Sequence, residues 1–167
     1  GQAFYDSQLG EDVNGSENKR ASISYDGNTI AIGMTDSSEV IVMQWDGTIW
    51  QPFGSPIQFS DPRRVSISGD GNVVAIGNAS TFEIYEYSSG SWNLVYSNGT
   101  VLIKSQLALD YSGDNLVVGG VNELKVFSRI GNSWDNDVIL YIGSISYPLY
   151  SVDIDSIGNR IVFGLST

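Results

Sequence analysis

The chain has 167 residues, of which 41% are hydrophobic, and its 19 acidic and 8 basic side chains give a formal net charge of −11. This charge repels a phosphate backbone, so nucleic acid is not an expected partner, and no apolar run approaches the ~18 residues of a membrane span. Histidine and cysteine are both absent, which excludes imidazole bases, thiol nucleophiles, zinc sites built on these residues, and disulfides.

The first predicted element is a lone strand in residues 1–20. The segment Gln8–Val13 (QLGEDV) matches Pro52–Ile57 (PFGSPI) later in the chain. Because that later segment closes a four-stranded unit, residues 1–20 are expected to supply a fourth strand without the three that precede it.

The next predicted unit occupies residues 21–60. The pattern of apolar and polar residues predicts strands at Ala21–Tyr25 and Glu39–Trp45, and a fourth that carries Trp50 and Phe53. Thr29–Gly33 is predicted as the second strand, and it is apolar on both faces, as a strand near the middle of a sheet should be. An Asp-Gly-Asn turn joins the first two, and its residues tolerate the positive φ of a tight hairpin. No segment has helical spacing, so the chain is predicted to be all-β.

The rest of the chain repeats this unit. Ser22–Gly33 (SISYDGNTIAIG) returns as Ser66–Gly77 (SISGDGNVVAIG), and looser copies run over residues 108–119 and 153–164. The turn glycines are 44, 42 and 45 residues apart and three tryptophans are 42 and 42 apart: Gly27, Gly71, Gly113, Gly158; Trp50, Trp92, Trp134. The repeat defines units 61–104 and 105–148, and a last unit, 149–167, with only a first and a second strand.

Four short strands in each unit of about 43 residues predict a β-propeller. It would be one domain over residues 1–167, with three full blades and two partial blade ends. Two arrangements remain open. The chain forms a small ring closed by its own ends, or it is an open piece that takes strands from another copy or a neighbouring propeller segment, since an unpaired strand edge attracts a partner.

The pattern S-x-S-x-D-G-N-x-hydrophobic-A-I-G, followed by a valine-rich strand, G-x-x-W and F/L-G, resembles the FG-GAP repeats related to integrin alpha propellers. The resemblance covers about Gln8 to Gly164. It implies a propeller with extracellular adhesive or scaffolding work, often with calcium in a loop between strands. The calcium form uses several acidic residues in alternation, whereas each loop here keeps one or two: Asp26, Asp70, Asp114, and Asp153 with Asp155. No cofactor is therefore expected, and these aspartates are weak calcium candidates.

Three Asn-x-Ser/Thr triplets fall in predicted loops, at Asn14, Asn78 and Asn98. Such triplets are acceptors for N-linked glycans in secreted proteins, and a loop places a glycan in solvent. Together with the family resemblance they predict a secreted or cell-surface glycoprotein.

The recurring residues also have interpretations that need no ligand. Trp50, Trp92 and Trp134 could form a sugar-binding platform, but one tryptophan per unit at a fixed position favours packing between blades. The aspartates of the Asp-Gly turns, Asp26 and Asp70, are required by hairpin geometry alone.

A glycosidase is the catalytic alternative, because Ser24–Thr29 resembles the S-x-D-x-G-x-T-W box of sialidases. The glycine comes one place early and no tryptophan follows. Such enzymes need an arginine cluster and a pair of carboxylates, and the chain has five arginines of which only Arg63 and Arg64 are adjacent. The chain is predicted not to be an enzyme.

These observations together predict a non-catalytic, extracellular structural or adhesive propeller that assembles into a polymer or fibril by strand or blade complementation. Its partners would be copies of itself, glycans or extracellular proteins. The alternative is a propeller that recognises a carbohydrate or a protein through its loop face.

Overall fold

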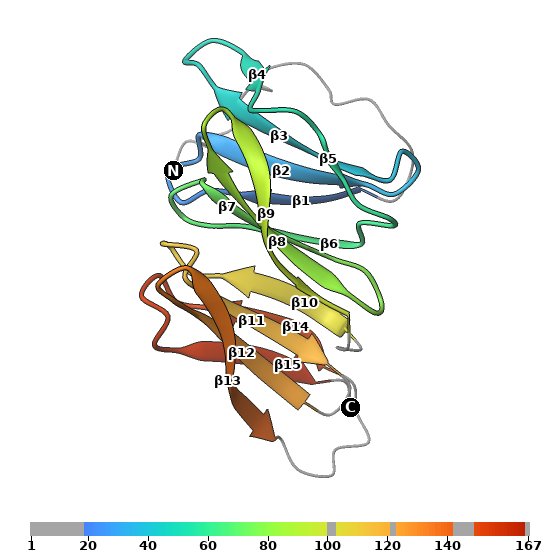
Figure 1. Cartoon of the computed structure of the whole chain (residues 1–167), viewed down its shortest axis with the longest axis vertical. Coiled ribbons are helices and arrows are strands. Elements are labelled where there is room, and N and C mark those ends of the chain that lie inside the picture. The colour runs from blue at the N-terminus through green and yellow to red at the C-terminus, as the bar shows by residue number, and fades with distance from the viewer. Residues whose placement is uncertain (1–18, 100–102, 121–122, 142–148, 166–167) are drawn as a thin grey trace, which may run out of the picture.

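The computed structural model describes residues 19–99, 103–120, 123–141 and 149–165, and these residues form fifteen strands and no helix (Figure 1). The prediction of an all-β chain is confirmed. Since the described residues contain no helix, none of them forms a helix that could cross a bilayer.

The strands form four antiparallel sheets, and each sheet is built from one sequence unit. The first sheet holds β1 (Lys19–Ile23), β2 (Thr29–Met34), β3 (Glu39–Trp45), β4 (Trp50–Pro52) and β5 (Ile57–Gln58). The second holds β6 (Arg64–Ile67), β7 (Val73–Gly77), β8 (Phe82–Ser88) and β9 (Ser91–Asn98). The third holds β10 (Ile103–Leu109), β11 (Asn115–Gly120), β12 (Glu123–Ile130) and β13 (Ser133–Tyr141), and the fourth holds β14 (Leu149–Ile154) and β15 (Ile161–Leu165).

Most predicted strands of the first unit agree with this structure. The bounds of β3 are confirmed, and β2 extends one residue past the predicted end. The first strand begins at Lys19 and ends at Ile23, so residues 19 and 20 belong to β1 and not to a preceding fourth strand. The predicted strand at Gln8–Val13 lies outside the described residues.

The predicted fourth strand of the first unit is two short strands, β4 and β5, which both pair with β3. Gly54 between them has φ +80°, and Pro56 has no N–H to donate to a ladder. The chain therefore leaves the sheet after β4 and returns to pair Ile57 with Val40.

The core consists of three apolar layers, one between each pair of successive sheets. Strand β7 shows how one strand serves two layers, because all five of its residues are buried. Val74 and Ile76 pack toward the first sheet, whereas Val73 and Ala75 pack toward the third. Successive side chains of a strand point to opposite faces, so a strand between two layers has to be apolar throughout, as the predicted second strands are.

The turn after the first strand also joins neighbouring sheets. Asp26 accepts hydrogen bonds from the Ser24 hydroxyl at 2.7 Å and the Asn28 N–H at 3.0 Å, and Asp70 repeats this turn in the second sheet. The glycine that follows each aspartate has a positive φ. From the second sheet onward this glycine lies against the second strand of the preceding sheet, with Gly71 at Thr29, Gly113 at Val73 and Gly158 at Asn115.

A cavity along the first strands

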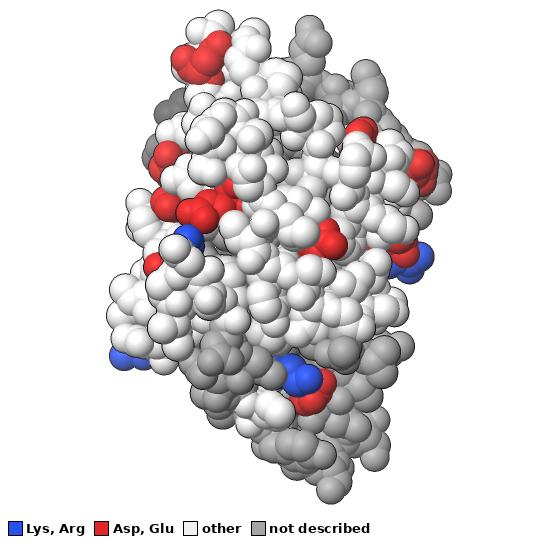
Figure 2. Space-filling model, in the orientation of Figure 1, with Lys and Arg blue, Asp and Glu red and all other residues white. Residues whose placement is uncertain are grey.

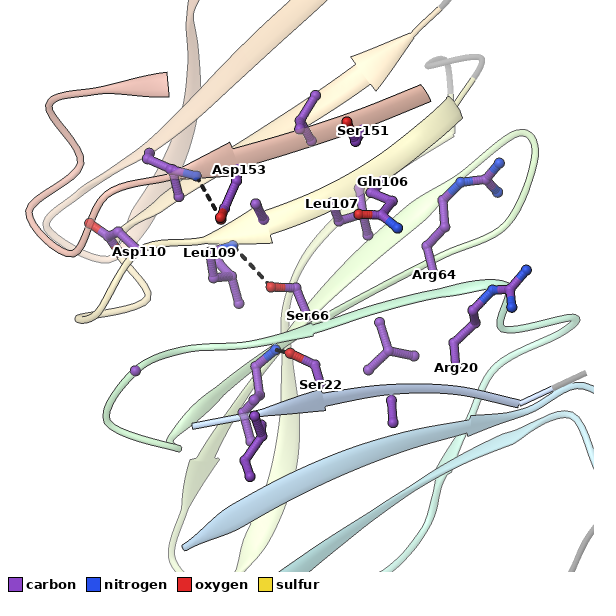
Figure 3. Close-up of a pocket in the computed structure, with 18 of the residues that line it drawn as sticks. Arg20, Ser22, Arg64, Ser66, Gln106, Leu107, Leu109, Asp110, Ser151 and Asp153 are labelled. Carbon is purple, nitrogen blue, oxygen red and sulfur yellow. Dashed lines mark hydrogen bonds between the residues drawn. The ribbon is translucent and has the colours of Figure 1, made fainter. Parts of the chain in front are cut away.

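The first strands of the four sheets lie side by side and line a cavity of about 1260 Å³ (Figure 3). Strands β1, β6, β10 and β14 form its wall, and the turns that follow them form one end. Each first strand has one neighbour in its own sheet, and it also contacts the first strands of the adjacent sheets.

Polar side chains occupy one equivalent position on these four strands. Arg20, Arg64 and Ser151 are each paired in register with a glycine of the second strand, namely Gly33, Gly77 and Gly164. Gln106 has the same place in the third sheet, since the next residue, Leu107, pairs with Val118. Figure 3 shows Arg20, Arg64, Gln106 and Ser151 together at one end of the cavity.

Positive charge gathers at this end of the cavity. Arg20, Arg63 and Arg64 line it, which is three of the five arginines of an acidic chain. On the face drawn in Figure 2, by contrast, acidic side chains are spread over the upper part of the molecule. The lining as a whole carries three arginines and three aspartates (Asp61, Asp110 and Asp153), so it is less acidic than the chain as a whole.

Burial lowers the pKa of the half-buried Arg64 guanidinium, and the neighbouring charges of Arg63 and then Arg20 lower it further. Asp61 acts in the opposite direction with the smallest effect, and its carboxylate pairs with Arg63 at 2.7 Å. Nη1 of Arg64 also donates to the Asn78 carbonyl oxygen at 3.1 Å. At Arg64 the charges of the two neighbouring arginines thus outweigh that of the nearby carboxylate.

Serine hydroxyls join the first strands of neighbouring sheets across the wall of the cavity. The Ile67 N–H donates to Ser22 Oγ at 3.1 Å, and the Leu109 N–H donates to Ser66 Oγ at 3.0 Å. The third sheet has Ala108 at this position, and the Ile154 N–H donates instead to Asp153 Oδ1 at 2.9 Å.

We expect Ser66→Ala to lower the free energy of unfolding by about 1–3 kcal/mol, because the buried Leu109 N–H would lose its acceptor. Urea denaturation followed by tryptophan fluorescence measures the change. The exposed Ser156→Ala is the control, with an expected change within ~0.5 kcal/mol. Equal effects of the two substitutions would show that the hydroxyl bridge between the sheets contributes nothing.

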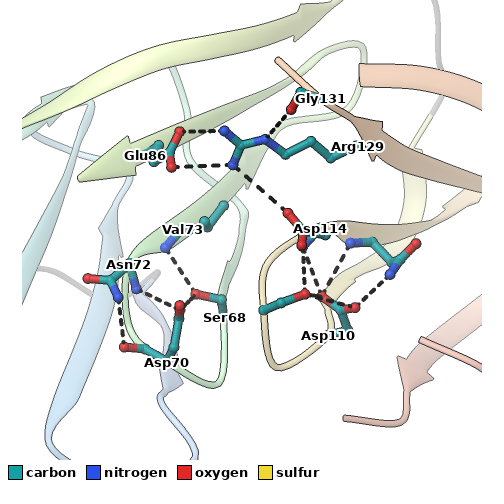
Figure 4. Close-up of polar contacts among 11 residues, drawn as sticks. Ser68, Asp70, Asn72, Val73, Glu86, Asp110, Asp114, Arg129 and Gly131 are labelled. Carbon is teal, nitrogen blue, oxygen red and sulfur yellow. Dashed lines mark hydrogen bonds and ion pairs between the residues drawn. The ribbon is translucent and has the colours of Figure 1, made fainter. Parts of the chain in front are cut away.

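The aspartates considered as calcium ligands have other partners. Hydrogen bonds, first from the Asn28 N–H and then from the Ser24 hydroxyl, hold the pKa of Asp26 below its usual value. Asp155 accepts from the N–H groups of Asn159 and Arg160. Asp70 lies in its turn and Asp114 lies 3.9 Å from Arg129 Nη1 (Figure 4). Across the described ranges, no three acidic side chains come close enough together to hold a metal ion.

A buried carboxylate that the sequence analysis did not identify lies at Asp110, where Ser24 and Ser68 stand in the first two sheets. It accepts from the Ser112 hydroxyl and from the N–H groups of Asp114 and Asn115, and its second oxygen accepts from Asn115 Nδ2 at 2.7 Å. Its environment is that of a turn-forming group. The sequence does indicate this position, because the third copy of the repeat aligns Asp110 with those two serines.

The other predicted residues are dispersed over the molecule. Asn14 lies outside the described residues. Asn78 Nδ2 donates to the Ser60 carbonyl oxygen at 3.1 Å, and Asn98 Nδ2 donates to the Tyr96 hydroxyl at 3.2 Å. Both asparagines are partly exposed, and their glycosylation stays a prediction.

The three tryptophans have different surroundings. Trp134 is 9% exposed and belongs to the layer between the second and third sheets. Trp92 packs on the layer between the first and second sheets and donates from Nε1 to the Phe53 carbonyl oxygen at 2.7 Å. Trp50 lies against Trp45 of its own sheet, with ring centroids 5.5 Å apart. None of the three lines the cavity described above.

Comparison with known proteins gives relationships of fold only. No protein-family model and no curated protein matches the chain. Two solved structures that share the fold, each named a "putative 6-phosphogluconolactonase", come from Bacteroides fragilis and Bacteroides uniformis. They are 14% and 12% identical to the chain, with TM-scores of 0.55 and 0.59 over 70% and 86% of its length. The hydrazine synthase of Kuenenia stuttgartiensis is similar over 87%, at 14% identity and a TM-score of 0.58.

The chain spans less than half of each of these solved structures, between 36% and 46% of their lengths. Two of the proteins that share the fold are named for lactonase activity, and none of those compared above is named for adhesion. The prediction of a structural or adhesive module that assembles into a polymer is therefore wrong. It relied on a repeat pattern that reports sheet and turn geometry, and that geometry is common to proteins of unrelated function.

Proposed function

We propose that the four sheets are blades of a β-propeller and that the cavity along their first strands binds a small anionic ligand through Arg20 and Arg64. The ligand is held and not chemically altered. The ligand class is a compound with a phosphate or carboxylate group. The single observation that carries this proposal is the placement of two arginines, one repeat apart, at the same register position of adjacent strands.

The propeller arrangement is supported by the repeated sheets. Each sheet contacts the next through a continuous apolar layer, and each first strand faces the shared cavity. In a propeller the blades pack in this face-to-face manner around a central channel. The cavity would then be part of the channel wall.

The anionic ligand is supported by the electrostatics of the cavity. Burial and the charges of Arg63 and Arg20 lower the pKa of Arg64. An anion between the guanidinium groups would compensate this repulsion, and planar guanidinium groups match the oxygens of phosphate and carboxylate. The two Bacteroides structures are also named for activity on a phosphorylated compound.

Binding without turnover is supported by the residues that line the cavity. The chain has no histidine and no cysteine to act as base or nucleophile. The carboxylates of Asp110 and Asp153 already accept hydrogen bonds from neighbouring groups, and Asp61 is paired with Arg63. Both oxygens of the Asp110 carboxylate are used in this way, so this buried group is not a free general base.

Isothermal titration calorimetry with inorganic phosphate and with 6-phosphogluconate tests the proposal. We expect Arg64→Gln to weaken binding about tenfold or more, because a hydrogen bond to a charged group contributes about 1.5–3 kcal/mol. Arg160→Gln is the control, since it removes one exposed arginine outside the cavity. The proposal fails if the wild-type chain binds neither anion, or if the control loses as much affinity as Arg64→Gln.

A further inference from the structure

Two exposed tyrosines stand at the end of the cavity opposite the arginines. Tyr25, Gly69, Tyr111 and Ser156 occupy the same position in the turns after β1, β6, β10 and β14. The Tyr25 N–H donates to the Gly69 carbonyl oxygen at 2.9 Å, and the Tyr111 N–H donates to the Ser156 carbonyl oxygen at 3.2 Å. Backbone hydrogen bonds therefore fix the turns that carry both tyrosines.

The glycine between the two tyrosines gives their rings room to meet. A Cβ atom on Gly69 would lie 2.4 Å from Cδ2 and 2.8 Å from Cα of Tyr111, so no side chain fits there. The Tyr111 ring contacts Tyr25 edge to face, with centroids 5.8 Å apart and an interplanar angle of 74°. We call this pair the aromatic ledge.

Burial within the chain does not account for the aromatic ledge. Tyr25 is 80% exposed and Tyr111 is 46% exposed. Neither belongs to one of the three apolar layers. Both rings line the same cavity as Arg20 and Arg64. The ledge therefore offers aromatic surface to a molecule inside the cavity.

The spacing of the two ends limits the shape of that molecule. Tyr25 follows Arg20 by five residues, of which the three steps within β1 rise about 10 Å before the turn begins. A ligand that reaches both ends has to be elongated, with its charge at one end and a flat ring at the other. A monosaccharide phosphate is too short, whereas a nucleoside polyphosphate has both the length and the polarity.

We infer that the cavity binds a nucleoside polyphosphate, with the base on the aromatic ledge and the phosphates at Arg20 and Arg64. This rests on the proposed function, because the arginines are the same. Bases of any kind stack on tyrosine rings, since each base presents a π-face. The aromatic ledge would therefore bind the base by stacking, which the arginines alone cannot do.

The test compares adenosine triphosphate with inorganic tripolyphosphate, which carries the same phosphate chain without a base. We expect the wild-type chain to bind adenosine triphosphate about tenfold more tightly, because stacking on an aromatic side chain contributes a factor of about 5 to 150. Tyr25→Ala should abolish the difference and leave tripolyphosphate binding unchanged, and Tyr25→Phe should retain it. Tyr150→Ala is the control, since Tyr150 is an exposed tyrosine that lines the cavity outside the ledge.

The outcomes separate the two proposals. If the wild-type chain binds both compounds equally, the aromatic ledge has no role and the anion site stands. If Tyr25→Ala weakens both compounds alike, or Tyr150→Ala has the same effect as Tyr25→Ala, ring recognition by the ledge is overturned. If neither compound binds, both proposals fail. If adenosine triphosphate alone binds and Arg64→Gln does not weaken its binding, the anion site is overturned. The proposal that one ligand contacts both ends of the cavity is then overturned too.

Discussion

Phe82→Ala is expected to lower the free energy of unfolding by about 3–5 kcal/mol, the range for removing a large side chain from a well-packed core. The Phe82 side chain is fully buried between the second and third sheets. Its ring lies 4.9 Å from that of Phe127 and 5.7 Å from that of Tyr96, measured between centroids. The cavity left by alanine would lie among rigid rings that cannot move in to fill it.

Urea denaturation followed by far-ultraviolet circular dichroism measures this loss. The matched control is Phe163→Ala on β15, where the phenylalanine is 39% exposed and a loss of about 1 kcal/mol or less is expected. A loss for Phe82→Ala no larger than that of the control would contradict the assignment of Phe82 to the core between the sheets. Should Phe82→Ala fail to fold, Phe82→Leu provides a smaller loss in the same direction.

Gly113→Ala is expected to lower the free energy of unfolding by about 3 kcal/mol through two effects. Gly113 has φ +74°, where a non-glycine residue is strained by roughly 1–2 kcal/mol. In addition, its Cβ would lie 2.6 Å from Cβ of Val73 in the second sheet. Because that atom is fixed to the backbone, the two sheets would have to separate, and such overpacking adds about 1–3 kcal/mol.

Gly27→Ala is the matched control, because Gly27 has the same turn position and φ +75° but nothing within 4 Å of its Cβ position. It should show the backbone strain alone, about 1–2 kcal/mol. The difference between the two variants in urea denaturation measures the close approach of the sheets. If the two variants lose equal free energy of unfolding, the turn glycines are required only by the hairpin backbone and have no part in packing between sheets.

The strands could be predicted from the sequence because turn chemistry and alternation are local properties. The repeated Ser-x-Asp-Gly-Asn turn identified the hairpins of the first and second sheets, and Glu39–Trp45 was predicted with the bounds that β3 has. The break between β4 and β5 was missed, although Gly54, with φ +80°, and Pro56 are local signals for it; the close approach of Gly54 to Trp92 of the next sheet has no such signal. A Cβ at Gly54 would lie 2.9 Å from Cδ1 of that tryptophan, a contact made only after the sheets pack.

The candidate site was not predicted, although its residues stand at repeat positions. Arg20 and Arg64 each precede a serine of the repeat by two residues. The arginines were considered only as a cluster adjacent in sequence, whereas the fold brings them together on neighbouring strands one unit apart. Tyr25 and Tyr111 are turn residues 86 positions apart, and their contact depends on the space above Gly69. Such juxtapositions follow from packing between units and leave no signal within one unit.

The serine bridges between first strands show that the units are not interchangeable modules. The Ser66 hydroxyl of the second unit accepts a hydrogen bond from a backbone N–H of the third unit, whereas Ala108 of the third unit has no side-chain acceptor for the fourth. The fourth unit compensates with its own Asp153. A second unit moved to the fourth position would bring a serine where this aspartate stands, and Ala108 would leave the facing N–H without an acceptor. Each unit is therefore adapted to a particular neighbour, and the order of the repeats is itself encoded in their differences.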